Sequence, residues 1–305
     1  MISIYTVDAF TRELFRGNPA GVCTTFQDVS SSTELDKFFQ EIATEMNISE
    51  TAFITKAKHE SSSSNVRYFL QWFTPTNEVD LCGHATLSTA HILFEQYLQN
   101  SGNNEIIFET KCAGELKVKK CDDQGRLQLD FPMGDPQPIE IEQEILNEIK
   151  TKLNLTQKTI LDTQLCKRTK KLLIQLSSID ETIKPQQTLT DIQFHPSIQP
   201  FIRGIILTSK SSTNKQIDFI SRYFAPWNGI LEDPVTGSAH TVLAVYWSKI
   251  FKKTILYGYQ QSARGGDVEC ELDEQNQRVL LRGYAVTVLK GQFQIQREQI
   301  LEKNK

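Results

Sequence analysis

The sequence lacks the features that mark several large classes of protein. None of its six cysteines (Cys23, Cys82, Cys112, Cys121, Cys166 and Cys270) belongs to a CxxC pair. No uninterrupted apolar segment approaches the roughly 20 residues that a bilayer-spanning helix needs. The first residues, MISIYTVDAF, contain no basic region followed by an apolar run, so no secretory signal is expected. We therefore expect reduced thiols and a cytoplasmic location.

Sequence motifs for nucleotides and metals are also missing. There is no Walker A loop and no GxGxxG motif after a strand, so no nucleotide cofactor is indicated. His84 and His91 lie seven residues apart, which is not the spacing of a paired helical metal site. No other cluster of His, Cys and carboxylates is visible, so we expect neither a metal nor an organic cofactor. The net charge of −4 gives no reason to expect nucleic acid or an anionic membrane as a partner.

The chain is organised around the stretch Thr74–Ala90, TPTNEVDLCGHATLSTA. Its pattern predicts an extended approach, a tight Cys82-Gly83 turn and a helix beginning near His84. Apolar residues occupy nearly every side of this helix, which is typical of a helix buried in a core. The N-terminus of a helix offers unpaired backbone N–H groups and the positive end of the dipole. The turn at Gly83–Ala85 is therefore a natural seat for a small anion.

A second copy of this pattern occurs 236 − 82 = 154 residues later. Glu232–Ala244, EDPVTGSAHTVLA, aligns with Glu78–Ala90 without a gap, and Thr236 takes the place of Cys82. We predict two similar halves, 1–134 and 135–305, each with a buried helix, after Gly83 and Gly237 respectively. An arrangement in which the final strand crosses back to complete the first half stays open.

Strand patterns outnumber helix patterns in both halves. The periodicity predicts outer amphipathic helices over Thr33–Met46 and Ile139–Leu153. The first strands expected in the second half are Leu172–Leu176, Gly204–Leu207 and Asp218–Phe224. The simplest architecture is an α+β fold of two pseudo-symmetric halves, each a curled β-sheet or barrel around a central helix.

Three residues near the first copy are candidates for chemistry. Glu50 is either a surface charge at the end of a turn or an acid–base group, because pKa tuning requires a pocket. Cys82 is expected to be a small buried residue, since Thr236 is too weak an acid to complete a two-thiol racemase. His84 is a general acid, a donor that orients a ligand, or a structural histidine.

The second copy offers a similar choice. Asp233 and Ser238 either cap the helix start, where acidic and hydroxyl side chains are common, or line an anion site. In the second case Asp233 is a charge partner and the Gly237–Ser238 backbone holds the anion. Arg264-Gly265-Gly266 is a candidate clamp for a carboxylate, although a bare Arg-Gly-Gly is a weak signal.

Several segments together resemble one family, the PhzF-like (phenazine biosynthesis isomerase-like) proteins. They span almost the full length of the chain in the family's order, and the run Arg222–Trp227 is most similar to the animal members. The segments are Val7–Phe10, Gly17–Ala20, Ser49–Phe53, Phe73–Pro75, Glu78–Thr86, Glu232–His240 and Arg264–Gly266.

The resemblance implies the diaminopimelate epimerase fold and an active site between the two halves. It also implies a cofactor-independent isomerase, because the founding enzyme moves a proton and a double bond in a dihydro-hydroxyanthranilate without metal or organic cofactor. Glu50 matches the family's acid–base group, and a partly buried glutamate can hold a pKa near neutrality. His84, Asp233 and Ser238 match residues that surround the substrate and help to move or orient protons.

The resemblance leaves the substrate open beyond a small, cyclic or unsaturated carboxylic acid. It implies a homodimer, and it implies substrate contacts by Asn18, Cys82, Gly83, Ala85, Thr236, Gly237, Arg264, Gly265 and Gly266. Two alternatives remain: a protein-interaction module that retains the fold, and a racemase or epimerase. The racemase is weaker because the second thiol is missing.

Overall fold

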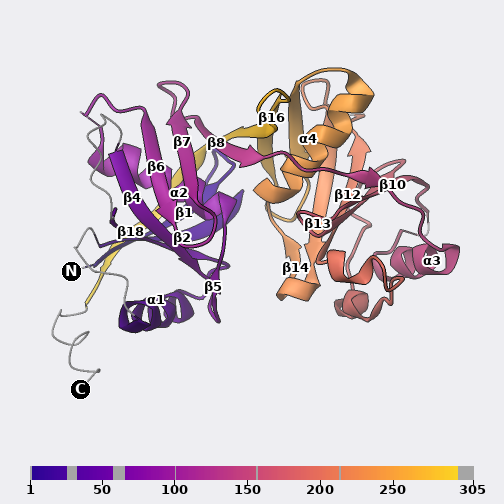
Figure 1. The fold of residues 1–305 in the computed structure, drawn as a ribbon, viewed down its shortest axis with the longest axis horizontal. Coiled ribbons are helices and arrows are strands. Elements are labelled where there is room, and N and C mark those ends of the chain that lie inside the picture. Colours follow the sequence, from indigo (N-terminus) through magenta and orange to yellow (C-terminus); the bar gives the residue numbers. More distant parts are fainter. Residues whose placement is uncertain are drawn as a thin grey trace. The chain divides into compact units, whose positions relative to one another are not determined.

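The computed structural model describes residues 2–25, 33–57, 66–99, 101–155, 157–212 and 214–294. The chain forms two compact units, and in Figure 1 the first is indigo to magenta with the yellow strand β18, while the second runs from magenta through orange. Unit 1 is Met1–Asp130 together with Arg282–Lys305, and unit 2 is Phe131–Leu281. The expected second half, 135–305, therefore includes a C-terminal segment that packs with unit 1. The chain crosses back at its end to complete its first unit.

The strands of unit 1 form one curled, mixed sheet. The pairs β1–β2, β3–β4 and β6–β7 are antiparallel, and the pairs β2–β3 and β4–β6 are parallel. A short strand, β5 (Glu78–Val79), adds an antiparallel partner to β4. The order across the sheet is β18 (Ala285–Phe293), β1 (Ile2–Ala9), β2 (Asn18–Thr24), β3 (Thr51–Lys56), β4 (Val66–Phe73), β6 (Glu105–Thr110), β7 (Glu115–Lys120) and β8 (Leu127–Pro132).

Unit 2 repeats this topology. The pairs β10–β11, β12–β13 and β15–β16 are antiparallel, and the pairs β11–β12 and β13–β15 are parallel. The short strand β14 (Ile230–Asp233) adds to β13 as β5 adds to β4. The order is β9 (Gln137–Pro138), β10 (Ile160–Cys166), β11 (Lys171–Leu176), β12 (Gly204–Lys210), β13 (Phe219–Ala225), β15 (Ile255–Gln260) and β16 (Gly266–Asp273), after which β17 (Arg278–Gly283) follows in the chain.

Each unit has a buried helix, as the internal repeat predicts, and the two helices occupy equivalent places in the order of strands along the chain. In unit 1 it is α2 (Gly83–Ile92), which continues as a π-helical turn, η1 (Leu93–Tyr97). In unit 2 it is α4 (Gly237–Phe251). Eight of the ten residues of α2 are buried, so this helix has no solvent-facing side and little amphipathic character. The hydroxyls of Thr86 and Thr89 donate to backbone oxygens one turn earlier, at 2.6 and 2.7 Å, which satisfies these polar groups inside the core.

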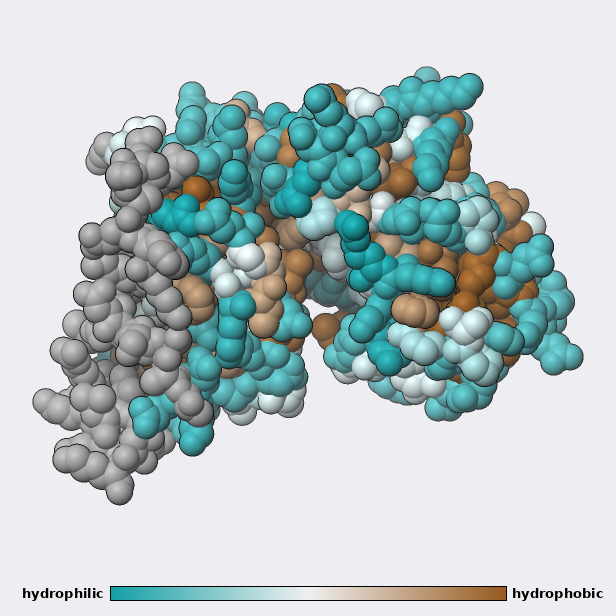
Figure 2. Space-filling model, in the orientation of Figure 1, coloured by the Kyte–Doolittle hydropathy of each residue, from teal (hydrophilic) through white to brown (hydrophobic). Residues whose placement is uncertain are grey.

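Amphipathic helices cover the outside of the sheets. α1 (Thr33–Met46) packs against β3 and β4, and its Phe39 stacks on Phe53 with ring centroids 4.2 Å apart. α3 (Gln143–Lys152) contributes Ile149 to the core of unit 2. Short 3-10 turns, η2 (Gln187–Asp191), η3 (Gln199–Phe201) and η4 (Pro226–Asn228), complete this unit. Most of the face shown in Figure 2 is hydrophilic or neutral, with hydrophobic patches visible on both units.

The predicted and observed elements differ in the start of α3 and in strands that were not predicted, among them β5, β9, β10 and β14. α3 begins at Gln143 rather than Ile139, because the backbone N–H of Ile139 bonds to the carbonyl of Thr163 in an extended segment. β10 was not predicted, since its residues, ILDTQLC, mix polar and apolar side chains. Among the described residues no helix is both long enough and apolar enough to cross a membrane.

Candidate active site

Glu50 is positioned by the parallel pairing of β2 with β3. The N–H of Gly21 donates to the carbonyl of Glu50 at 2.9 Å, immediately before β3 begins. The neighbouring Ser49 hydroxyl donates to the Pro19 carbonyl at 3.3 Å. The turn that leads into Pro19 requires glycine, because Gly17 has a φ of 64° and a Cβ there would lie 2.1 Å from the Ala9 oxygen.

Cys82 and His84 come from the start of α2. Cys82 is the N-cap residue, with extended backbone (φ −138°, ψ 112°) and no side-chain hydrogen bond that caps the helix. Its carbonyl accepts from the Thr86 N–H at 3.1 Å. Because the N-cap side chain leaves the first turn uncapped, the sulfur is available to its neighbours and the first amides to a ligand.

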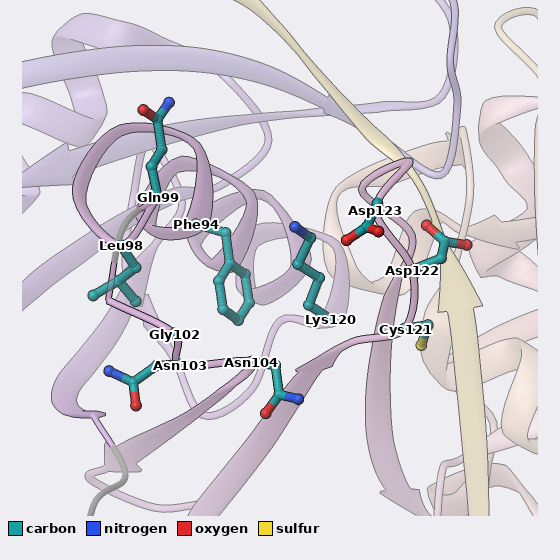
Figure 3. Close-up of a pocket in the computed structure, with 10 residues that line it drawn as sticks. All are labelled: Phe94, Leu98, Gln99, Gly102, Asn103, Asn104, Lys120, Cys121, Asp122 and Asp123. Carbon is teal, nitrogen blue, oxygen red and sulfur yellow. The ribbon is translucent and has the colours of Figure 1, made fainter.

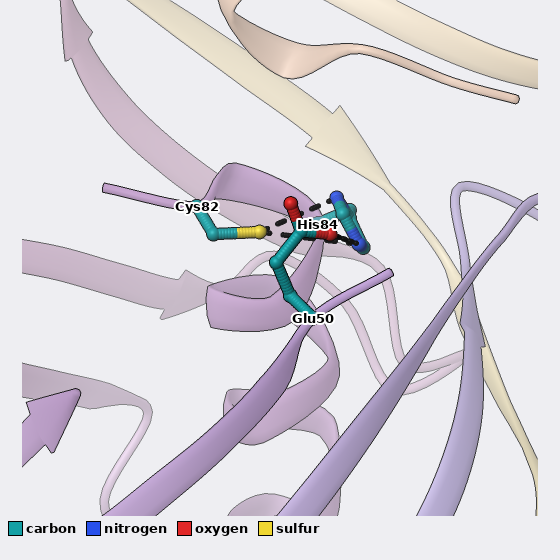
Figure 4. A group of neighbouring side chains, drawn as sticks. All are labelled: Glu50, Cys82 and His84. Carbon is teal, nitrogen blue, oxygen red and sulfur yellow. Dashed lines mark hydrogen bonds and ion pairs between the residues drawn. The ribbon is translucent and has the colours of Figure 1, made fainter. Parts of the chain in front are cut away.

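Glu50, Cys82 and His84 meet in one cluster (Figure 4). The Nε2 atom of His84 lies 3.2 Å from Oε2 of Glu50, and the two side chains are 8% and 13% exposed. The sulfur of Cys82 lies 3.4 Å from Nδ1 and 3.9 Å from Nε2 of the same imidazole. The helix start and the end of the Ser49-Glu50 turn therefore place a carboxylate, an imidazole and a thiol within hydrogen-bonding reach.

The pKa of Glu50 is lowered in this environment. Burial is the largest single influence and raises the pKa, but the charge of the neighbouring His84 imidazole, 3.2 Å away, outweighs it. For His84, burial lowers the pKa, while Cys82 and Glu50 raise it well above its ordinary value. The expectation of a Glu50 pKa near neutrality is thus reversed, because the partner histidine stabilises the carboxylate.

Burial raises the pKa of the Cys82 thiol, and the Glu50 charge adds to this effect although His84 opposes it. These directions favour an ionised carboxylate on Glu50 and a protonated thiol on Cys82. A carboxylate that is already ionised can accept a proton without first losing one, which is the requirement for a general base.

In unit 2 the start of α4 carries a second polar group of residues, centred on Asp233. Asp233 is 8% exposed and accepts a hydrogen bond from the Thr236 hydroxyl through Oδ2. The side chain of Gln260 accepts from the Thr236 N–H at 2.9 Å and donates to the Asp233 carbonyl at 2.6 Å. Because the Thr236 hydroxyl is turned to Asp233, it does not cap α4.

The Arg264–Gly266 segment lies beside this turn. The Ser262 hydroxyl donates to the Pro234 carbonyl at 2.8 Å and accepts from the Gly265 N–H at 3.0 Å. Gly265 has a φ of 68°, and a Cβ there would lie 2.1 Å from the Tyr259 hydroxyl, so this position also requires glycine. Arg264 is half-buried.

The structure therefore groups most of the predicted site residues at the two helix starts. In unit 1 it brings Glu50 to Cys82, Gly83, His84 and Ala85, and Asn18 lies buried at the first position of β2. In unit 2 it brings together Asp233, Thr236, Gly237, Ser238 and, through Ser262, the segment Arg264–Gly266.

Sequence reasoning missed three features of these groups. It found no cluster of His, Cys and carboxylates, because Glu50 is far from Cys82 in the chain. It also missed Gln260, an amide at the end of a strand, which joins Asp233 to Thr236. The third feature is Lys171, a buried amine close enough to Asp233 to be influenced by its charge. Burial lowers the pKa of Lys171 to about 8. No local spacing marks any of these residues.

A separate surface hollow of about 320 Å³ lies in unit 1 (Figure 3). It is bounded by Phe94 and Leu98 at the end of the buried helix and by the Lys120–Asp123 hairpin. The hairpin turn is closed by its own bonds, since Asp122 accepts from the N–H groups of Gln124 and Arg126 at 3.0 Å. The hollow contains none of the predicted site residues.

Comparison with known proteins identifies the family. The family model described as "Phenazine biosynthesis-like protein" matches residues 7–291. The chain belongs to this PhzF-type family. A mouse member, phenazine biosynthesis-like domain-containing protein 1, is 41% identical over 95% of this chain and 98% of its own length. A Halalkalibacterium halodurans protein named as an uncharacterized isomerase is also 41% identical, over 95% of this chain and 97% of its own.

Solved structures of the PhzF family have the same fold. The family member from Enterococcus faecalis has a TM-score of 0.80 and 35% identity, covering 96% of this chain and 99% of its own. A hydroxyproline epimerase from Agrobacterium vitis has a TM-score of 0.55 at 12% identity, covering 96% of this chain and 90% of its own. This second similarity shows that the PhzF fold is shared with the epimerase and proline racemase-like proteins.

Proposed function

We propose that the protein is a cofactor-independent isomerase that moves a carbon-bound proton in a small carboxylic acid. The observation that supports this most strongly is the buried contact of 3.2 Å between Glu50 and His84. The contact with His84 keeps the carboxylate ionised in a largely buried site, so that it is able to accept a proton. The bacterial relatives named as uncharacterized isomerases support the reaction class.

In the proposed reaction, an oxygen of Glu50 accepts a proton from a carbon next to the substrate's unsaturated system. The same group then returns the proton to another carbon, and the double bond moves between them. Imidazolium His84 lies beside the carboxylate, where it stabilises negative charge that develops on the substrate. The uncapped first amides of α2, at Gly83 and Ala85, are suited to hold the substrate carboxylate.

Residues of unit 2 complete the proposal. We assign Asp233 and Ser238 to proton transfer or orientation at the start of α4, and Thr236, Gly237 and Arg264–Gly266 to substrate binding. In unit 1, Asn18 and Cys82 are assigned to substrate binding. The proposal also includes a cytoplasmic location and a homodimer, and the family resemblance supports the homodimer. It includes no nucleic acid or membrane partner, in keeping with the net charge of −4.

The test is Glu50→Gln, which preserves the shape of the side chain but removes its ability to accept a proton. Solvent deuterium incorporation into the carboxylic acid that the wild type binds should fall by roughly a hundred- to ten-thousand-fold. The acid is found by mass spectrometry of ligands that copurify with the wild type. Binding of this acid and the cooperativity of unfolding should be retained.

Glu45→Gln makes the same chemical change at an exposed position of α1 and serves as the matched control. Its exchange rate should equal that of the wild type. If Glu50→Gln exchanged carbon-bound hydrogen as fast as the wild type, Glu50 would not be the base. If the wild type bound no acid and catalysed no exchange, the alternative of a non-catalytic interaction module would replace the proposal.

A further inference from the structure

Lys171 is a buried amine in unit 2 that has no part in the proposed reaction. It is the first residue of β11 and is only 7% exposed. Alternate residues of a strand lie on the same face of a sheet. Gln175, four residues further along β11, accepts a hydrogen bond from Tyr246 of α4 at 2.7 Å. Lys171 therefore belongs to the face of the sheet that the buried helix covers.

A row of residues across this face leads from Lys171 to Asp233. Lys171 is paired with Gly204 of β12, and Tyr223 of β13 is paired with Asp233 of β14. A Cβ on Gly204 would lie 2.2 Å from the Tyr223 hydroxyl, so the glycine leaves room for the end of this ring. The Lys171 amine lies 5.3 Å from the centre of the same ring. The Tyr223 side chain thus reaches from the strand beside Asp233 to the amine.

The amine has few partners for a buried cation. Its Nζ atom donates to the Thr169 carbonyl at 3.0 Å, and it forms no ion pair with any residue that the structure describes. Burial lowers the pKa of Lys171 to about 8, although Cys166 and Asp233 act in the opposite direction. An ammonium group that loses its water without a carboxylate in contact disfavours folding. Such departures from the packing rules of a core are expected at functional sites.

We propose that Lys171 is a positioning residue of the isomerase, whose ammonium group acts across Tyr223 on the buried Asp233 carboxylate and keeps it ionised at neutral pH. This inference rests on the proposed function, in which Asp233 moves or orients a proton at the start of α4. The ionised carboxylate accepts the Thr236 hydrogen bond. Because water screens charges weakly in a buried site, the ammonium group acts beyond contact distance and takes no oxygen from the substrate.

Stability and activity should respond differently to the loss of this cation. Lys171→Met keeps an unbranched, flexible side chain and removes the charge. Its free energy of unfolding in urea at neutral pH should equal or exceed that of the wild type, because an apolar group replaces a buried ammonium. A variant that unfolded far more easily than the wild type would show that Lys171 has a structural role instead.

The pH dependence of solvent deuterium exchange into the copurifying acid tests the role in catalysis. The lowered pKa of Glu50 keeps its own acid limb at low pH. A tyrosine and a thiol also face the amine, Tyr223 and Cys166, and neither type of group titrates in acid. In Lys171→Met, protonation of Asp233 should move the acid limb to higher pH by about one unit or more. The rate should return to that of the wild type at alkaline pH, where Asp233 is ionised in both proteins.

Two further variants control this experiment. Lys170→Met removes the same charge from the neighbouring, exposed position and should have the pH profile of the wild type. Lys171→Arg retains a cation and should keep the acid limb near its wild-type position. A Lys171→Met enzyme that was slower by the same factor at every pH would overturn the proposal, since loss of packing alone produces that result.

The link between the two side chains is also measurable without any reaction. Titration of ¹³Cε-labelled lysine by NMR reports the pKa of Lys171, and its signal is the one that Lys171→Met lacks. Asp233→Asn should lower this pKa because it removes a nearby negative charge, and an unchanged value would refute the link. A wild type without exchange would refute the proposed function. Exchange that depended on Glu50, with an unshifted acid limb in Lys171→Met, would refute the role of Lys171 alone.

Discussion

At the residue scale, His240 is a histidine kept neutral by its position. It is fully buried in the first turn of α4, where its Nδ1–H donates to the Thr236 carbonyl at 2.8 Å. Its Nε2 atom has no hydrogen-bond partner among the described residues. Burial lowers its pKa from 6.5 to about 4, although the Thr236 carbonyl acts in the opposite direction.

A pH dependence of stability follows from this buried imidazole. Between pH 6.5 and about 4 the unfolded chain binds a proton at this position that the folded chain does not bind. Stability should therefore be independent of His240 above pH 6.5 and should fall as the pH drops towards 4, by roughly 3 kcal/mol in total. His240→Asn, which retains a donor near Nδ1, should remove this part of the acid sensitivity in urea unfolding measured across the pH range.

His195→Asn is the control for this experiment, because His195 is an exposed histidine of unit 2. Its pH dependence should follow that of the wild type. A His240→Asn variant that lost stability with falling pH as steeply as the wild type would show that His240 is not a source of the acid sensitivity.

At the element scale, the two halves use their matching glutamates differently. Glu232 forms two hydrogen bonds with Arg222, at 2.6 and 2.7 Å, and the two side chains are only 19% and 9% exposed, respectively. Its equivalent, Glu78, pairs with Lys111 at 2.7 Å, with exposures of 26% and 52%. The Arg222 pair fastens β14, which carries Asp233 at its end, to β13.

Removal of the cation should consequently have unequal effects in the two halves. Arg222→Met leaves the Glu232 charge buried without its partner and also removes the bond from Arg222 to the Ile183 carbonyl. We expect it to lower the free energy of unfolding by about 3–5 kcal/mol. Lys111→Met should cost at most about 1 kcal/mol, because the Lys111–Glu78 pair is exposed to solvent.

Chemical denaturation of both variants measures the contrast. Equal losses of stability would contradict the argument from burial, and so would a larger loss in Lys111→Met. Arg222→Lys separates charge from geometry, since it keeps the positive charge but cannot form two parallel bonds to the carboxylate. Its stability should lie between those of the wild type and Arg222→Met.

At the scale of the whole molecule, the C-terminal strand is an essential part of unit 1. β18 pairs with β1 from Ile2↔Phe293 to Ala9↔Ala285. The Thr287 hydroxyl on β18 donates to Glu95 at 2.9 Å and lies 3.0 Å from the imidazole of His91. The strand therefore closes the hydrogen-bonding edge of β1 and contacts the buried helix.

Truncation after Gly283 should selectively destabilise unit 1. It exposes the backbone groups of β1 and the polar side chains that Thr287 satisfies, whereas unit 2 keeps all its strands. Hydrogen exchange followed by mass spectrometry should show loss of protection in β1, β2 and α2. Protection of β11, β12 and α4 should be retained, and equal loss in both units would contradict the division of the chain.

The fold was predictable where the signal was local or repeated. Thr33–Met46 was predicted to its end residues because its apolar side chains recur at helical spacing. The repeat around Gly83 and Gly237 predicted two buried helices, and the structure confirms both. β10 was missed because its residues do not alternate between polar and apolar, and it is a strand through its pairing with β9 and β11.

The sequence by itself determined the two helix starts, the identity of Glu50, Cys82 and His84 as candidates, and the family to which they belong. Only the tertiary structure decided that these three side chains touch, and that the Glu50 pKa falls rather than rises. The physical reason is that a pKa depends on the charges within a few ångströms of the group. Glu50 and His84 are distant in the chain, and the pairing of β2 with β3 beside the start of α2 brings them together.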